Sequence, residues 1–202
     1  MSHTAPPTVV NVGYRSTNFW VVSSGPSRLL VDLGWMGRAG ALFANLERMG
    51  VPLNEIGWGL ATHYHGDHAG AAQDLKQKGM RLLVMEEQVH AIPLMKQWMK
   101  PADNYTDIDT RDNVVISCAA SRVFLLERGI PGEIVHTPGH SDDSVTLILD
   151  DGRAFTGDLT NEAMVAREDP AVVARSWQLL RDRGVTTIYA GHGPIRPLRP
   201  PP

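Results

Sequence analysis

A short run of potential metal ligands is the most informative feature of this 202-residue chain. Residues 62–68 read Thr-His-Tyr-His-Gly-Asp-His, which places His63, His65, Asp67 and His68 close together. In an extended turn His63 and His65 point to the same side, because side chains alternate with a period of two. Asp67 and His68 are adjacent and diverge, so they can bind at a second centre. The block therefore predicts a metal site that takes its remaining ligands from distant segments.

Three further candidate ligands each follow an expected strand and stand in a turn that contains glycine. They are His140 in Thr-Pro-Gly-His, Asp158 in Thr-Gly-Asp and His192 in Gly-His-Gly. Strand ends place side chains at one rim of a sheet, and glycine allows the tight turns that such a rim requires. We therefore expect these residues to complete the metal site. No functional role is expected for the remaining histidines, His3, His90 and His136.

Both halves of the chain that must position these ligands mix strands with helices. Periodicity and turn signals predict strands at 9–23, 28–33, 56–62, 81–85, 114–118, 122–127, 133–137, 144–149, 153–156 and 186–190. They predict helices at 38–49, 67–78, 86–100 and 169–183. Hairpins are many and strict strand–helix–strand steps are few. We therefore expect an α+β fold of two mixed sheets flanked by helices, rather than a doubly wound parallel sheet.

The segment 101–113 is polar and acidic, and it is too long for a simple connector. Long loops in compact domains often serve as lids or binding loops. We hypothesise that this segment and the helix before it cover the metals and set an acyl-chain preference. The apolar residues nearby are also typical of an ordinary hydrophobic core; they are Met85, Met95, Trp98 and Met99.

Composition excludes several classes of protein. A net charge of −3 gives no attraction to nucleic acid, and 43% hydrophobic residues support a folded core. The aliphatic runs are too short to span a membrane, and the first residues lack a secretion signal. Cys118 alone allows neither an internal disulfide nor a cysteine-based zinc site, and we expect it to be a small buried apolar residue. We expect a cytoplasmic protein with one domain over residues 1–202, a core at 9–193 and a proline-rich tail at 194–202.

The order of these motifs resembles the metallo-β-lactamase superfamily, in its broad hydrolase branch that includes glyoxalase II and the lactonases. The resemblance runs from a Val-Asp-x-Gly strand end at Asp32 to Gly-His-Gly at His192, and it covers most of the chain. It implies an αββα sandwich with the site at one rim. It also implies that Asp32 orients a ligand histidine from behind.

The same resemblance assigns the ligands to two metals. One metal would be bound by His63, His65 and His140, and the other by Asp67, His68 and His192. Asp158 would bridge both. The implied cofactor is a pair of divalent metal ions, with zinc expected and manganese or iron as alternatives.

The chemistry implied by this assignment is hydrolysis by a metal-bridging hydroxide. Two cations that share a carboxylate and a water lower the pKa of that water from about 16 toward 7. Asp67 would pass a proton to the leaving group, so Asp67 and Asp158 are the catalytic candidates. Contacts to the substrate or its developing oxyanion are expected from Asn161, Tyr64 and Tyr105.

The expected function is therefore cleavage of a small ester, lactone or thioester by a monomer or homodimer that acts on a small-molecule substrate. Lactonases of this branch commonly carry a tyrosine three residues after the bridging aspartate, where this chain has Asn161. Only a short tail follows His192, so a glutathione-binding C-terminal extension is not expected. The alternatives are a phosphodiesterase, a β-lactam hydrolase, and a non-hydrolytic iron-dependent redox or metal-binding protein.

Overall fold

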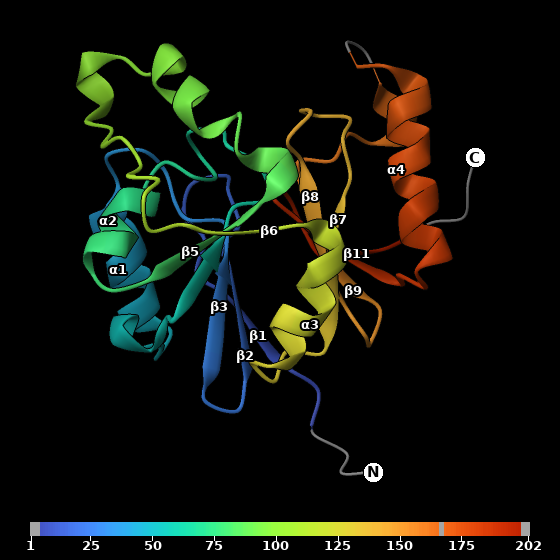
Figure 1. Cartoon of the computed structure of the whole chain (residues 1–202), viewed down its shortest axis with the longest axis horizontal. Coiled ribbons are helices and arrows are strands. Elements are labelled where there is room, and N and C mark those ends of the chain that lie inside the picture. The colour runs from blue at the N-terminus through green and yellow to red at the C-terminus, as the bar shows by residue number, and fades with distance from the viewer. Residues whose placement is uncertain (1–4, 166–167, 199–202) are drawn as a thin grey trace.

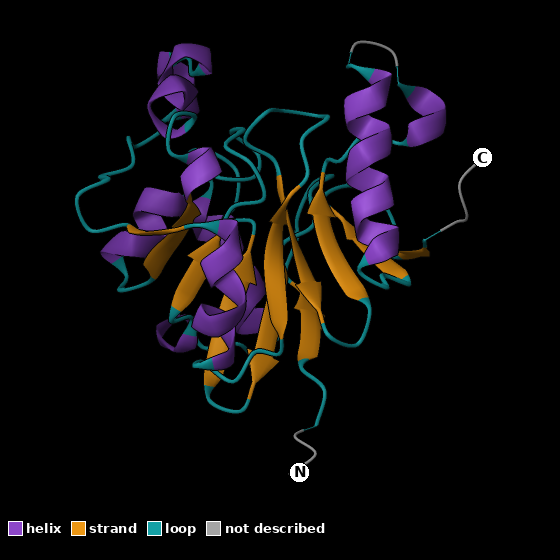
Figure 2. Cartoon of the chain, turned by 45° about the vertical axis from the view of Figure 1, so that its right-hand side comes forward, coloured by secondary structure: helices purple, strands orange, loops and turns teal. Residues whose placement is uncertain are grey.

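The computed structural model describes residues 5–165 and 168–198. His3 and the end of the proline-rich tail lie outside the described residues. Two β-sheets pack face to face, with helices against both outer faces (Figure 1). Figure 2 shows the strands of both sheets between two groups of helices. The predicted αββα sandwich of two mixed sheets is confirmed.

The first sheet has six strands that follow the order of the chain. They are β1 (Thr8–Asn11), β2 (Trp20–Ser24), β3 (Ser27–Val31), β4 (Trp58–Leu60), β5 (Arg81–Met85) and β6 (Val114–Ile116). Strands β1 to β3 are antiparallel, and β3 to β6 are parallel. Helices α1 (Ala39–Arg48) and α2 (Ala72–Gln77) cover the outer face, because Leu42, Leu46 and Leu75 are fully buried in one cluster with strand residues.

The second sheet has five strands in the order β11-β10-β9-β8-β7. They are β11 (Arg196–Pro197), β10 (Thr187–Ala190), β9 (Arg153–Gly157), β8 (Val145–Leu149) and β7 (Gly132–His136). Only the β9–β10 pair is parallel among these described strands. Helix α4 (Pro170–Asp182) covers the outer face through Val173, Trp177 and Leu180. Asp169 begins α4 by accepting a hydrogen bond from the Ala171 N–H at 2.8 Å.

The apolar core between the sheets brings the strand ends to a common rim. Trp20 of β2 packs edge-on against Phe155 of β9 at 6.2 Å between ring centroids. Both side chains belong to a cluster that joins β2–β5 to β7–β9. Since β3 and β4 run parallel, as do β9 and β10, residues that follow these strands lie at the carboxyl ends of their sheets. Strand β7 runs in the same direction as β9, because each is antiparallel to β8. The residues with candidate chemistry follow β3, β4, β7, β9 and β10.

One predicted strand, at 122–127, is wrong. The segment forms α3 (Ser121–Leu126), in which Leu125 is buried and Val123 is 63% exposed. A short apolar run is ambiguous because periodicity alone does not separate a strand from a helix. The structure resolves the ambiguity locally, because Ser117 caps the turn before α3 by accepting from the Ala120 N–H.

Other predicted elements differ in extent. The strand predicted at 9–23 is interrupted between β1 and β2, and the helix predicted at 67–78 begins only at Ala72. The helix predicted at 86–100 consists of short 3-10 turns. These and the remaining 3-10 turns are Leu53–Glu55, Glu86–Gln88, Ile92–Trp98, Pro101–Asp103, Cys118–Ala120 and Glu162–Met164. Among the described residues, no helix is long and apolar enough to span a bilayer.

Candidate metal centre

The structure gathers the predicted ligands at the carboxyl-end rim of the two sheets. The block at 63–68 follows β4, and the three later candidates follow β7, β9 and β10. Their side chains form three overlapping groups, in each of which the candidate ligand atoms lie within 4.8 Å of one another. The groups are His63, His65 and His140; His63, His68 and Asp158; and Asp67, His68 and His192.

Asp158 lies between the two sets of residues that the family resemblance assigns to separate metals. Its Oδ1 is 3.3 Å from His68 Nε2, and its Oδ2 is 3.3 Å from His192 Nε2. The same Oδ2 is 3.8 Å from His140 Nε2. Oδ2 therefore lies within 4 Å of one histidine from each set, which is the position that a bridging carboxylate needs. Binding of metal by these residues stays a prediction.

The donor atoms at the centre are of the kinds that hold divalent cations. Among the described residues, three buried atoms of this cluster lack a hydrogen-bond partner: His63 Nε2, His68 Nε2 and Asp158 Oδ1. His68 Nε2 and Asp158 Oδ1 are near each other but do not form a hydrogen bond. Buried polar atoms are nearly always satisfied, and each exception requires an explanation. Imidazole nitrogens and carboxylate oxygens that converge on one point are the ligands that zinc, manganese and iron accept.

Asp32 fixes the orientation of His68 from behind. The Asp32 side chain is 1% exposed, and its Oδ2 is 2.8 Å from His68 Nδ1. Its Oδ1 accepts from the Thr62 N–H at 2.8 Å and from the Thr62 hydroxyl at 2.9 Å. When His68 Nδ1 donates to Asp32, the lone pair of Nε2 is left facing Asp158. Asp32 adopts a left-handed backbone with φ of 64°, which aspartate tolerates better than most residues.

Burial and neighbouring charges shift the pKa values of four residues in the cluster. Burial lowers the pKa of His63 well below the ordinary value, and the neighbouring histidines lower it further. Burial also lowers the pKa of His140. For His68, the Asp32 and Asp158 carboxylates outweigh burial and raise the pKa. Burial opposes ionisation of Asp158, but the close approach of His68 and the positive charges of His68, His192 and His140 lower its pKa. The cluster therefore holds Asp158 in its charged, ligand-competent form.

The loop between β1 and β2 positions Asp67 and His192, a role that the sequence did not reveal. The Thr17 hydroxyl donates to Asp67 Oδ2 at 3.3 Å and accepts from Trp35 Nε1 at 3.0 Å. His192 Nδ1 contacts the Ser16 carbonyl oxygen at 2.6 Å. A threonine within an apparent strand carries no motif, so only the three-dimensional contact identifies it.

A second buried network joins the two sheets behind the His63 block. The Tyr64 N–H donates to Asp143 Oδ2 at 2.7 Å. Gln88 is fully buried, and its Nε2 donates to the Ala61 carbonyl at 2.9 Å and to the Asp143 carbonyl at 3.3 Å. This network fixes the turn before His63 relative to the turn after His140. Neither Gln88 nor Asp143 belongs to a motif that the sequence makes recognisable.

The three predicted substrate contacts occupy different surroundings. Tyr64 is 4% exposed and belongs to the same apolar cluster as Leu42, Leu46 and Leu75 of α1 and α2. Tyr105 is half-buried, and its hydroxyl contacts Met95 Sδ at 3.6 Å. Asn161 is exposed and lines a cavity of about 300 Å³ together with His140, Asp158 and His192. Among the three, Asn161 shares a cavity with the candidate ligands, and its role in substrate binding stays a prediction.

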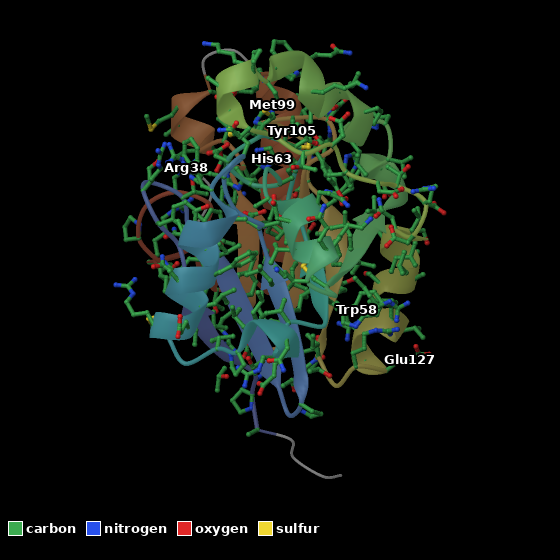
Figure 3. All side chains as sticks on the ribbon, turned by 90° about the vertical axis from the view of Figure 1, so that its left-hand side faces the viewer. Arg38, Trp58, His63, Met99, Tyr105 and Glu127 are labelled. Atoms are coloured by element: carbon green, nitrogen blue, oxygen red, sulfur yellow. The ribbon has the colours of Figure 1, made fainter. Side chains whose placement is uncertain are left out.

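The turn between His65 and Asp67 packs against Met36 and Met99, and Met99 precedes the segment 101–113 that is predicted as a lid. A side chain at Gly66 would meet the methyl group of Met99 at 2.8 Å and that of Met36 at 3.0 Å. The Asp103 carbonyl oxygen lies where a side chain of Gly37 would begin. Figure 3 shows Met99 and Tyr105 at the same end of the molecule as His63. The two methionines therefore form an apolar wall next to the His63 block.

The fold is a two-sheet sandwich whose rim gathers five histidines and two aspartates in groups that could hold metal ions. The family model described as the metallo-beta-lactamase superfamily matches residues 12–192. The chain belongs to this superfamily.

Curated relatives are longer than this chain. An atrochrysone carboxyl ACP thioesterase from Claviceps purpurea is 31% identical over 186 residues, which are 90% of this chain and 52% of that protein. A beta-lactamase-like protein 2 homolog from Caenorhabditis elegans is 24% identical over 183 residues, which are 90% of this chain and 57% of that protein. The chain thus spans about half the length of the curated relatives it matches.

Solved structures share the fold at low identity. The BLEG-1 B3 metallo-beta-lactamase superposes with a TM-score of 0.70 at 22% identity, covering 95% of this chain and 94% of that one. TTHA1623, crystallised in a di-iron-bound form, superposes with a TM-score of 0.70 at 23% identity and the same coverage. These similarities show the fold and leave the metal and the substrate undefined.

Proposed function

We propose that this protein is a dinuclear metal-dependent hydrolase that cleaves a small ester, lactone or thioester, and that a thioester is the preferred substrate. The observation that carries the proposal is Asp158, with one oxygen near His68 and the other near His192 and His140. The thioesterase name of the Claviceps purpurea relative supports the choice of a thioester.

The proposed ligands would hold two cations, and these cations would activate water and the substrate. His63, His65 and His140 would hold one cation, and Asp67, His68 and His192 the other. Bound cations supply Lewis acidity that makes water nucleophilic at neutral pH and stabilises negative charge on a carbonyl oxygen. Zinc is the proposed metal, with manganese and iron as alternatives.

Side chains of this protein would orient the substrate. Asn161 Oδ1 accepts from the Ala163 N–H at 3.0 Å, so its amide nitrogen is left as a donor toward the cavity that contains Asp158. A neutral donor in this position can bind a carbonyl oxygen as it gains charge. The methionines at Gly66 provide an apolar wall for an acyl chain.

Asp67 would hold a proton during departure of the leaving group. Its Oδ2 accepts from Thr17, which limits rotation of the carboxylate. An alcohol leaving group needs that proton more than a thiol does, because thiolates are much weaker bases. Loss of Asp67 should therefore slow oxygen esters more than thioesters when both are compared in the same metal-loaded variant.

The test is a substrate panel with the purified protein before and after chelation. Acyl thioesters, oxygen esters, lactones, phosphodiesters and a β-lactam are compared at equal concentration. Thioester hydrolysis should dominate, disappear with chelation, and return when zinc or manganese is added. Asp158→Asn should lower kcat by about 10²-fold or more, since removal of even an outer partner of a metal ligand costs 10–100-fold.

The matched control is Asp150→Asn, an exposed carboxylate that pairs with Arg122 at the end of β8. This control should retain its metal and its rate. Chelation-resistant hydrolysis would contradict the proposal, and so would full activity of Asp158→Asn. Dioxygen consumption by an iron-loaded protein without hydrolysis would favour the redox alternative.

A further inference from the structure

A second cavity opens beside the candidate metal centre, and it carries unpaired positive charge. It measures about 200 Å³, close to the volume of seven water molecules in the liquid. Its lining includes Arg15, Trp35, Arg38, Asp103 and Asn104. Figure 3 shows Arg38 at the same end of the molecule as His63, Met99 and Tyr105.

The two arginines are available for a ligand. Among the described residues, neither Arg15 nor Arg38 forms an ion pair with a carboxylate, whereas Arg122 and Arg153 do. Both arginines are exposed, and the Arg15 guanidinium lies over the Trp35 ring at 5.0 Å. The nearby Asp103 carboxylate accepts from the Lys100 N–H at 2.7 Å. The two guanidinium groups and the single Asp103 carboxylate together give the cavity lining a net positive charge.

The Tyr14 side chain links the two backbone segments that carry the arginines. The Tyr14 hydroxyl accepts from the Trp35 N–H at 3.0 Å and donates to the Arg38 carbonyl at 3.2 Å. Tyr14 therefore ties the segment that carries Arg15 to the segment that carries Arg38. Arg15 has a φ of 57°, a left-handed conformation that costs a non-glycine residue energy and is enriched at functional sites.

The cavity is coupled to the metal cluster by two hydrogen bonds. Trp35 lines the cavity and donates to Thr17, and Thr17 donates to Asp67. These contacts link a wall of the cavity to Asp67 of the cluster, so the candidate occupant of the cavity is a remote group of a substrate bound there. Guanidinium groups bind carboxylate and phosphate groups in a two-pronged manner, and such charge-assisted hydrogen bonds are about twice as strong as neutral ones.

We propose that Arg15 and Arg38 form an anion-binding subsite that recognises a phosphate or carboxylate on the substrate, remote from the bond that is cleaved. The subsite rests on the proposed hydrolase function for its biological meaning. Its ligand chemistry follows from the cavity and its charge. The anion belongs either to the leaving group or to the acyl group.

The experiment separates these two sources through binding of hydrolysis-resistant thioethers. Isothermal titration compares S-butyl pantetheine, which is neutral, with S-butyl 4′-phosphopantetheine, which carries phosphate on the leaving-group side. A third probe, S-(3-carboxypropyl) pantetheine, carries a carboxylate on the acyl side. The purified metal-loaded protein should bind one of the two anionic probes at least tenfold more tightly than the neutral probe.

The variants are Arg15→Gln with Arg38→Gln, and the matched control is Arg48→Gln at the opposite end of α1. The double variant should lose the preference for the anion while its affinity for the neutral probe changes less than twofold. Arg48→Gln should keep the preference. Equal binding of all three probes by the wild type would overturn the subsite, and so would a preference that survives in the double variant. If the protein hydrolyses no thioester but shows the arginine-dependent preference, the proposed function fails and the subsite stands.

Discussion

Replacement of Asp32 by alanine tests how the fold holds the candidate ligands. The change removes the acceptor of three hydrogen bonds, from the Thr62 N–H, the Thr62 hydroxyl and His68 Nδ1. The Thr62 hydroxyl can turn to His63 Nδ1, which is 3.2 Å away. The other two groups are left buried without a partner, at about 1–3 kcal/mol each. The left-handed backbone at residue 32 costs alanine about 1 kcal/mol more.

We therefore expect Asp32→Ala to lower the free energy of unfolding by about 3–7 kcal/mol. The assay is urea denaturation of metal-free protein, because bound metal would add its own stabilisation. The control is Asp142→Ala, whose side chain is 84% exposed and pairs only with His90 across the surface among the described residues. That control should lose less than about 1 kcal/mol. A loss below about 1.5 kcal/mol in Asp32→Ala would refute the reasoning.

Asp32→Asn separates stability from ligand orientation. The amide oxygen can still accept from both Thr62 groups, so the loss of stability should be smaller than in the alanine variant. The amide nitrogen would donate to His68 Nδ1 and leave the His68 proton on Nε2, which faces Asp158. We expect a folded protein whose metal affinity falls by about 10–100-fold. Unchanged metal affinity would show that Asp32 does not set the His68 tautomer.

Three further predictions test separate parts of the structure. Thr17→Val should lower kcat about tenfold, because the variant loses the hydrogen bond to Asp67. Thr17→Ser keeps the hydroxyl and should keep the wild-type kcat, so equal kcat values in the two variants would contradict this role. Gly70→Ala should lower the free energy of unfolding by about 3 kcal/mol or more, because a Cβ would overlap backbone atoms of Gly66 and Met36. In the control Gly40→Ala, the new Cβ in α1 has no atom within 4 Å, so the free energy of unfolding should stay the same or rise when both are measured by urea denaturation. Cys118 is half-buried, not fully buried as expected from the sequence. Partial burial and the Glu87 carboxylate raise the pKa of its thiol to about 12. Its alkylation by iodoacetamide at pH 8 should therefore be at least tenfold slower in folded than in denatured protein and should accelerate as pH rises, and equal rates in the two states would contradict the raised pKa.

The fold could be predicted in large part because its buried strands and capped helices carry strong local signals. The strand Arg81–Met85 matches its predicted bounds, and the helix predicted at 169–183 begins at Pro170 after an aspartate cap. Segment 122–127 failed because its apolar run fits a helix as well as a strand. Helix α2 begins later than predicted, and the residues before it include Gly70, whose close approach to the Met36 backbone no local pattern reports.

The gathering of the candidate ligands could be predicted because motifs at strand ends converge at a rim. The groups that orient them could not, since their signal is spatial. Thr17 and Gln88 act through hydrogen bonds to residues distant in the chain, and each looks like an ordinary polar residue in sequence. The pair formed by Arg15 and Arg38 likewise depends on Tyr14, which ties their segments together.

An anomalous difference map from crystals of metal-loaded protein tests the proposed dinuclear centre most directly. Two peaks are expected on opposite sides of Asp158. One should lie among His63, His65 and His140, and the other among Asp67, His68 and His192. A single peak, or two peaks that do not share Asp158, would contradict the dinuclear centre.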